Sequence, residues 1–150
     1  LGDKLGRLLW QLLPPTPSRP DDLEAFLRLL PREVQGLPLR HVLDVRHPSF
    51  ATEEYLELLA RHGCTTVYTD SEKFASIPHA RSELAYLRLM RSAPDCATGY
   101  PPEELARWVQ GAREWVAAGE RHEAFVFFIN GAKERAPHAA MEFLRQLRAS

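Results

Sequence analysis

Short apolar runs alternate with amphipathic stripes along the first third of the chain. Residues 7–13 form an apolar run that is too short for a helix and ends at Pro14, so they predict a buried strand. Leucine and phenylalanine at helical spacing predict an amphipathic helix over residues 20–30, and Ser18 has the position of its capping residue. Residues 41–45 predict a second strand.

The same alternation continues to the end of the chain. Thr52 is expected to cap a second helix, and Gly63 to end it. Apolar and β-branched runs predict three further strands, and two more stripes predict two further helices. The strands are 64–69, 84–90 and 124–129, and the helices are 101–118 and 137–148. Proline and polar residues between 71 and 82 predict a long loop.

Strands that alternate with helices and are almost continuously apolar indicate a parallel sheet covered by helices. The pattern leaves two α/β architectures open, a small doubly wound parallel sheet and part of a (β/α)8 barrel. The length of 150 residues favours the doubly wound sheet, because a complete barrel needs eight strands and typically about 250 residues. One domain is expected at this length, with 45% hydrophobic residues to form its core.

The charge balance, the cysteines and the lengths of the apolar runs indicate which kinds of partner and environment the chain is suited to. The chain has 19 Lys and Arg against 20 Asp and Glu, so it lacks the basic excess typical of nucleic-acid binding. Cys64 and Cys96 have no metal-site spacing and fit a reducing, cytoplasmic environment. No apolar stretch approaches the roughly 18 residues that suggest a membrane span, so no membrane partner is expected.

Candidate chemistry lies where the predicted strands end, because parallel α/β sheets bind ligands at the carboxyl ends of their strands. Asp44, His47 and Asp70 are candidate catalytic residues, suited to acid or base catalysis or to binding zinc, manganese or magnesium. Further polar residues at these strand ends are expected to bind a substrate. They are Gln11, Arg46, Ser49, Arg88 and Asn130.

A structural interpretation competes with the catalytic one. A charge inside an apolar strand is costly unless it meets an opposite charge, so Arg88 is expected to pair with Asp44 or Asp70 and hold neighbouring strands in register. The sequence contains no H-E-x-x-H, G-x-S-x-G, Walker or G-x-G-x-x-G motif. It therefore lacks the usual signatures of zinc peptidases, α/β-hydrolases, nucleotide triphosphatases and dinucleotide-binding proteins. The turn at 130–133 is suited to phosphate, although a glycine turn needs no ligand.

Five segments match the motifs of one protein family, in the correct order. Residues 1–15 resemble L-G-x-K-L-G-P-x-L-F-Q-L-P-P, 42–50 resemble V-x-E-x-R-H-x-S-W, 86–89 match the start of Y-x-R-x-H-G, 125–130 resemble Y-x-Y-F-N-N, and 135–140 resemble x-A-P-x-N-A. Along essentially its whole length the chain resembles the family called domain of unknown function 72, the YecE-like proteins.

This resemblance implies the C-terminal part of a TIM-type barrel. In the family, the opening segment lies around the fourth barrel strand, so the chain is expected to supply five β/α units and to lack about three at the front. Five strands alone leave two unpaired edges and half of an apolar interior exposed. We therefore expect either a longer native protein or an unstable fragment, and self-association if the chain is truly a half-barrel.

The chain departs from the family motifs at positions that matter for chemistry. Met90 and Arg91 stand where the family has His-Gly, Ile129 replaces an asparagine, Asp44 shortens a glutamate and Phe50 replaces a tryptophan. Methionine in place of histidine removes a titratable group and a metal ligand. A divergent or inactive member is therefore one hypothesis.

The family resemblance implies no particular reaction. Our leading hypothesis is an enzyme acting on a small polar or anionic substrate, with Arg46 and Arg88 holding the anion and His47 as acid or base. One alternative is a divalent-metal-dependent enzyme, by analogy with the barrels of endonuclease IV and xylose isomerase. The other is a non-catalytic barrel that binds a ligand or nucleic acid.

Overall fold

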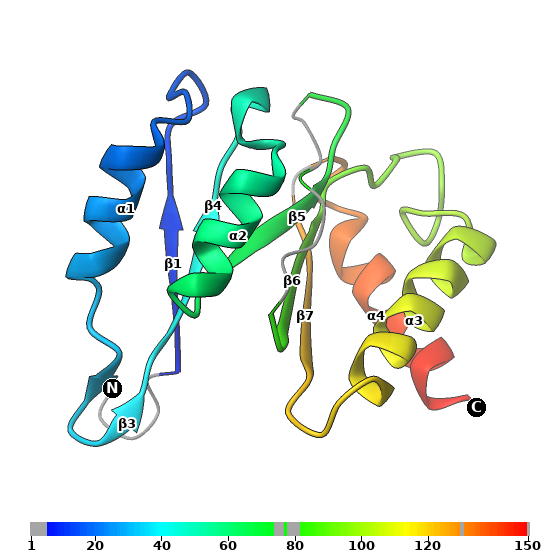
Figure 1. Ribbon diagram of the computed structural model, residues 1–150. Helices are drawn as coiled ribbons and strands as arrows, with labels where there is room; N and C mark the ends of the chain where they lie inside the picture. The colour runs from blue at the N-terminus through cyan, green and yellow to red at the C-terminus, as the bar shows by residue number, and fades with distance from the viewer. Residues whose placement is uncertain (1–5, 74–76, 78–81, 130, 150) are drawn as a thin grey trace. The chain divides into compact units, whose positions relative to one another are not determined.

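The computed structural model describes residues 6–73, 77, 82–129 and 131–149. Its contacts divide the chain into two compact units, which are described separately (Figure 1). The first unit comprises residues 1–68 and 74–82, and the second comprises residues 69–73 and 83–150. No helix within the described ranges is long and apolar enough to cross a membrane.

The first unit contains parallel strands covered by two helices. Strand β1 pairs with β4 from Arg7↔Arg40 to Gln11↔Asp44, and β4 pairs with β5 at Val42↔Thr65. A two-stranded hairpin and a short 3-10 helix complete it. The elements are β1 (Arg7–Gln11), α1 (Pro20–Leu29), β2 (Glu33–Val34), β3 (Leu37–Pro38), β4 (Arg40–Asp44), the 3-10 helix Pro48–Phe50, α2 (Glu53–Arg61) and β5 (Thr65–Asp70), whose last two residues belong to the second unit.

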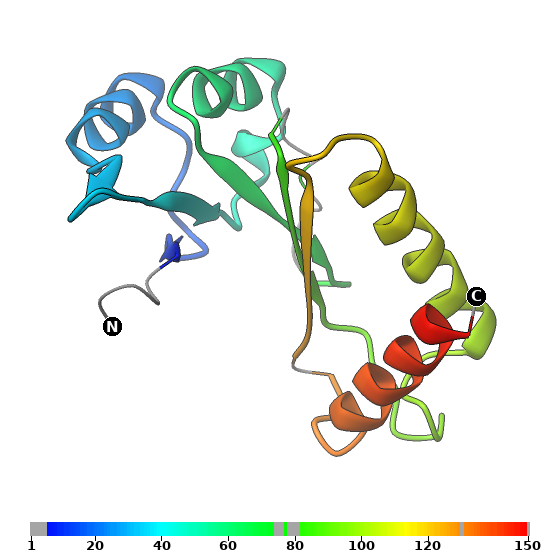
Figure 2. The ribbon, with the colours of Figure 1, turned by 90° about the horizontal axis from the view of Figure 1, so that it is seen from below.

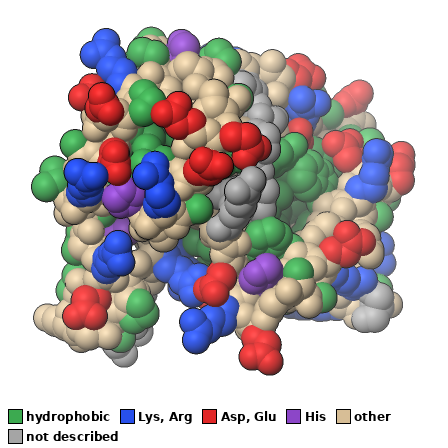
Figure 3. Space-filling view, in the orientation of Figure 1, with side chains coloured by type: hydrophobic (Ala, Val, Ile, Leu, Met, Phe, Trp, Pro, Cys, Tyr) green, Lys and Arg blue, Asp and Glu red, His purple; other side chains and the backbone are tan. Residues whose placement is uncertain are grey.

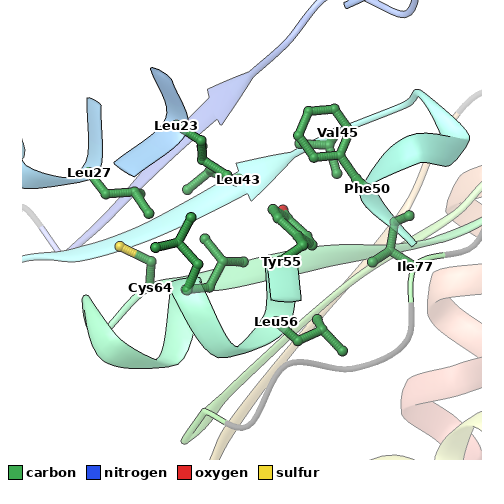
Figure 4. Packing of buried hydrophobic residues seen from close by; sticks show 11 residues of the cluster. Leu23, Leu27, Leu43, Val45, Phe50, Tyr55, Leu56, Cys64 and Ile77 are labelled. Carbon is green, nitrogen blue, oxygen red and sulfur yellow. The ribbon is translucent and has the colours of Figure 1, made fainter. Parts of the chain in front are cut away.

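The core of the first unit lies between its helices and one face of its strands (Figure 4). Leu43 of β4 and Val45, the residue after the strand, point to this side because residues two apart on extended backbone share a face. There they belong to the same cluster as Leu23 of α1. Thr52 caps α2 as predicted, because its hydroxyl accepts a hydrogen bond from the Tyr55 amide at 3.2 Å. Gly63 follows the helix with φ +65°, which confirms it as the stop.

The second unit pairs two parallel strands under two helices. Strands β6 (Leu84–Leu89) and β7 (Glu123–Phe128) are in register from Leu84↔Glu123 to Leu89↔Phe128. Figure 2 shows α3 (Pro102–Ala117) and α4 (Ala136–Arg148) side by side on one face of these strands. The core of this unit contains Leu89, Tyr100, Leu105 and Ala139. Stacked aromatic residues occupy the other strand face, where the rings of Tyr86 and Phe127 lie 4.9 Å apart.

The hydrogen-bonded order of the five parallel strands is β1-β4-β5-β6-β7. A doubly wound sheet reverses its order at a switch point, whereas a barrel adds each new strand beside the last. The steadily rising order has no such reversal and matches the order in which a TIM-type barrel adds its strands.

Two local predictions need correction or addition. Ser18 does not cap α1, since Arg19 occupies the capping position, no side chain caps the helix, and the Ser18 amide bonds to Ser49 instead. The β2–β3 hairpin was not predicted, because strands of two residues leave no periodicity. Residues 74–76 and 78–81 of the predicted loop lie outside the described residues.

Candidate functional site

A buried ion pair lies at the carboxyl end of β4. The Asp44 carboxylate is fully buried, and the Arg46 Nε and Nη2 atoms donate to its Oδ1 and Oδ2 atoms, each over 2.9 Å. Arg46 reaches Asp44 because residues two apart on extended backbone point to the same face. Paired, bidentate hydrogen bonds offset much of the cost of burying both charges. Arg46 is thus the cationic partner of Asp44 in the first unit.

His47 follows directly, and Ser49 fixes its ring. The Ser49 amide N–H donates to the Nδ1 atom of His47 over 3.2 Å, and the Ser49 hydroxyl lies 2.8 Å from the same nitrogen. Because a backbone N–H is always a donor, Nδ1 is an acceptor and the neutral ring carries its hydrogen on Nε2. The same bond caps the 3-10 helix Pro48–Phe50.

A third residue holds Ser49 in place. The Ser18 amide donates to the Ser49 hydroxyl oxygen over 2.7 Å, which leaves the hydroxyl hydrogen for Nδ1 of His47. A cavity of about 170 Å³ adjoins this chain of hydrogen bonds, with Ser18, Ser49, Thr52 and Tyr55 among its lining residues. Gln11, a predicted substrate-binding residue, is exposed beside Asp44 in the strand register.

Asp70 belongs to the second unit and has partners of its own. Its Oδ1 atom lies 3.1 Å from Nε of Arg91, and its Oδ2 atom accepts from the Tyr100 hydroxyl over 3.3 Å. The Arg91 amide in turn donates to the Tyr100 hydroxyl oxygen over 2.7 Å. Burial raises the pKa of Tyr100 above its ordinary value, so the phenol stays protonated and can donate to the carboxylate.

The partner of Asp70 differs from the sequence prediction. The cation that the structure shows beside Asp70 is Arg91, on the segment after β6. Arg88 is half-buried on its strand, and Asn130 lies outside the described residues. Sequence reasoning missed Tyr100 as a site residue, because its hydroxyl reaches Asp70 across 30 positions of the chain without any local signal. For Arg91 the sequence did contain a signal, because an arginine stands there in place of the glycine of the family motif.

The donor set does not fit a divalent cation. Both carboxylate oxygens of Asp44 accept from Arg46, and both of Asp70 have a partner in Arg91 or Tyr100. No group of three or more His, Cys, Asp or Glu residues able to hold a metal occurs in the described part of the chain. Each of these carboxylates already has an arginine as its counter-charge and lies in no such group, so we derive no step through a metal.

Comparisons with known proteins agree on one family. The whole chain, residues 1–150, matches the family described as "Protein of unknown function DUF72". A crystal structure of a DUF72 family protein from Thermotoga maritima MSB8 is similar to it, with 20% identity and a TM-score of 0.56. The similarity covers 93% of this chain and 55% of the Thermotoga chain, so this chain spans about half of that protein. Among curated proteins, no significant match was found. The chain therefore belongs to the DUF72 family.

Proposed function

We propose that the first unit binds a small polar or anionic substrate at the carboxyl end of β4, and that the Nε2–H group of His47 donates a hydrogen bond to it. The observation that carries this proposal is the pair of hydrogen bonds from Ser49 to Nδ1 of His47. These bonds leave Nε2 as the nitrogen that carries hydrogen. A neutral imidazole held in this way is an effective donor to a developing oxyanion.

The ion pair of Asp44 and Arg46 has a supporting role in this proposal. The two charges compensate each other, so the pair adds a fixed dipole rather than a net charge to the end of β4. The donors left for a negatively charged substrate are then neutral hydrogen-bonding groups, the Nε2–H group of His47 and the exposed Gln11 amide.

A second candidate function is binding without catalysis. Asp44 is held by Arg46, and Asp70 by Arg91, so each predicted catalytic carboxylate already has a resident cation. A carboxylate whose oxygens already accept hydrogen bonds from an arginine has fewer lone pairs free to take a proton from a substrate. This arrangement favours a site that recognises a ligand over one that removes a proton from it.

Substitutions of His47 test the proposal and separate the two functions. We expect His47→Ala to weaken binding about tenfold, since a hydrogen bond to a charged ligand is lost. His47→Gln keeps an N–H donor but loses the fixed imidazole aimed at a developing oxyanion, so it should retain binding while any turnover falls at least about 100-fold. Binding and turnover are measured with a panel of small carboxylates and phosphate esters, by calorimetry and by product analysis.

His138→Gln is the matched control, since it replaces an exposed histidine of α4 in the second unit. It should change neither quantity. Binding without any turnover in the unaltered chain would assign the site to binding alone, and turnover that survives in His47→Gln would contradict a catalytic role for His47. Unchanged binding in His47→Ala would contradict the proposal itself.

A further inference from the structure

A second cavity lies at the opposite end of the first unit from His47. It has a volume of about 310 Å³ and is bordered by the end of α1, the start of β4 and the turn from α2 into β5. In Figure 1 these segments meet near the lower ends of α1 and α2. The volume falls at the lower end of the range typical of small-molecule sites. The proposed function makes no use of this cavity.

The apolar part of the lining comes from three leucines, Leu27, Leu30 and Leu39. His41 adds a polar side chain whose ring nitrogens are already bonded. Its Nδ1 atom accepts from the Trp10 indole N–H over 3.1 Å, and its Nε2 atom donates to the Pro31 carbonyl over 2.7 Å. This ring therefore forms a wall of the cavity and offers no free donor or acceptor to a ligand.

Cys64 also lines the cavity, but as a neutral thiol. Its Sγ atom donates to the His62 carbonyl over 3.5 Å, and burial raises the pKa of the thiol to about 11. A thiol with this pKa is protonated near neutral pH. The protonated form is a poor nucleophile and a poor metal ligand. The chemistry suited to this cavity is therefore binding rather than covalent or metal chemistry.

The charged residues around the cavity are predominantly cationic. The Glu24 carboxylate accepts a hydrogen bond from Arg28 over 3.1 Å and lies 3.6 Å from Nε2 of His62. One negative charge is therefore shared between these two basic side chains. Arg32 also lines the cavity, and its guanidinium has no hydrogen bond or ion pair with the residues that the structure describes. Figure 3 shows basic and histidine side chains gathered around the lower ends of α1 and α2.

The hairpin of β2 and β3 fixes the backbone of Arg32. The Leu39 amide donates to the Arg32 carbonyl over 2.8 Å and closes the hairpin at its base. At the tip, Gln35 and Gly36 have φ values of +52° and +76°, as in the tight type I′ turns that join paired strands. The base of the Arg32 side chain is thus held at the cavity before any ligand binds.

We propose that this cavity binds a small organic anion whose carboxylate or phosphate group pairs with the Arg32 guanidinium. Planar guanidinium groups bind both kinds of oxyanion through two parallel hydrogen bonds. The three leucines would contact an apolar body next to that head group. Since Glu24 balances Arg28, the unmatched charge of Arg32 calls for one negative group on the ligand.

Titration of the full chain followed by ¹H–¹⁵N NMR tests this proposal. The probes are benzoate, phenyl phosphate and inorganic phosphate, and the reporters are the amides of Arg32, His62 and Gly63. We expect benzoate or phenyl phosphate to shift these amides saturably, and Arg32→Gln to weaken that binding about tenfold. The matched control is Arg107→Gln on α3, which removes an exposed arginine of the second unit and should leave binding unchanged.

The outcomes identify the ligand class or reject the site. Saturable shifts with benzoate alone assign a carboxylate ligand, and shifts with phenyl phosphate alone assign a phosphate ester. The proposal is overturned if neither organic anion shifts the three amides, or if Arg32→Gln binds as tightly as the unaltered chain. It is also overturned if inorganic phosphate binds as tightly as phenyl phosphate, because the leucines would then contribute nothing.

Discussion

Replacing Asp44 with asparagine is expected to lower the free energy of unfolding by about 3–5 kcal/mol. The carboxylate is fully buried, and the Arg46 side chain beside it is only 5% exposed. Removing the negative charge therefore leaves a buried guanidinium without its counterion, and that group cannot recover its hydration without opening the end of β4. Urea denaturation followed by circular dichroism measures the change.

A double variant separates the loss of the ion pair from the burial of an unpaired charge. Adding Arg46→Met to Asp44→Asn should recover part of the lost stability, since no buried charge then remains. The control is Glu142→Gln, which breaks the exposed pair with Arg145 and should leave the unfolding midpoint unchanged. A loss below about 1 kcal/mol for Asp44→Asn would show that the carboxylate is solvated in the folded chain.

Gly131→Ala is expected to cost about 2–4 kcal/mol of stability. Gly131 has φ +58°, a conformation that costs an L-residue about 1–2 kcal/mol. A Cβ atom there would also lie 2.7 Å from the Ser92 carbonyl oxygen and 2.9 Å from its amide nitrogen. The Ala132 amide donates to that same carbonyl over 2.8 Å, so Ser92 cannot withdraw without losing a bond between the two loops.

The matched substitution is Gly111→Ala within α3. Nothing lies within 4 Å of a Cβ atom at Gly111, and alanine is the better helix former, so stability should rise by up to about 1 kcal/mol. Thermal or urea denaturation of the two variants gives the comparison. Equal effects at the two glycines would contradict the loop packing described for the second unit.

The regular elements were predictable because each has a signal in the sequence. Strand β4 was predicted over 41–45 and spans Arg40–Asp44, and the Thr52 cap and the Gly63 stop of α2 are both present. The predicted cap at Ser18 was wrong, because Arg19 has the capping position of α1 and the Ser18 amide donates to the hydroxyl of Ser49, 31 residues away. Local patterns do not report such long-range competition for a backbone donor.

The candidate site was less predictable for a similar reason. Arg88 inside a strand was expected to pair with Asp44 or Asp70, and the pair of Asp70 with Arg91 just beyond the strand was not predicted. The pairing of Asp44 with Arg46 did have a signal, since charges two positions apart on extended backbone share one face. That signal is missed when the strand is taken to end at Val45 and Arg46 is assigned to a loop.

The most direct test of the account is the tautomer of His47, read from long-range ¹H–¹⁵N couplings in the imidazole ring. We predict that the neutral ring carries its hydrogen on Nε2 and that the signal of this nitrogen changes when a small carboxylate or phosphate ester binds. The Ser49→Ala variant removes the hydroxyl at 2.8 Å and should weaken the preference for this tautomer. A ring of the unaltered chain with its hydrogen on Nδ1 would contradict the account, because His47 would then present an acceptor to the substrate.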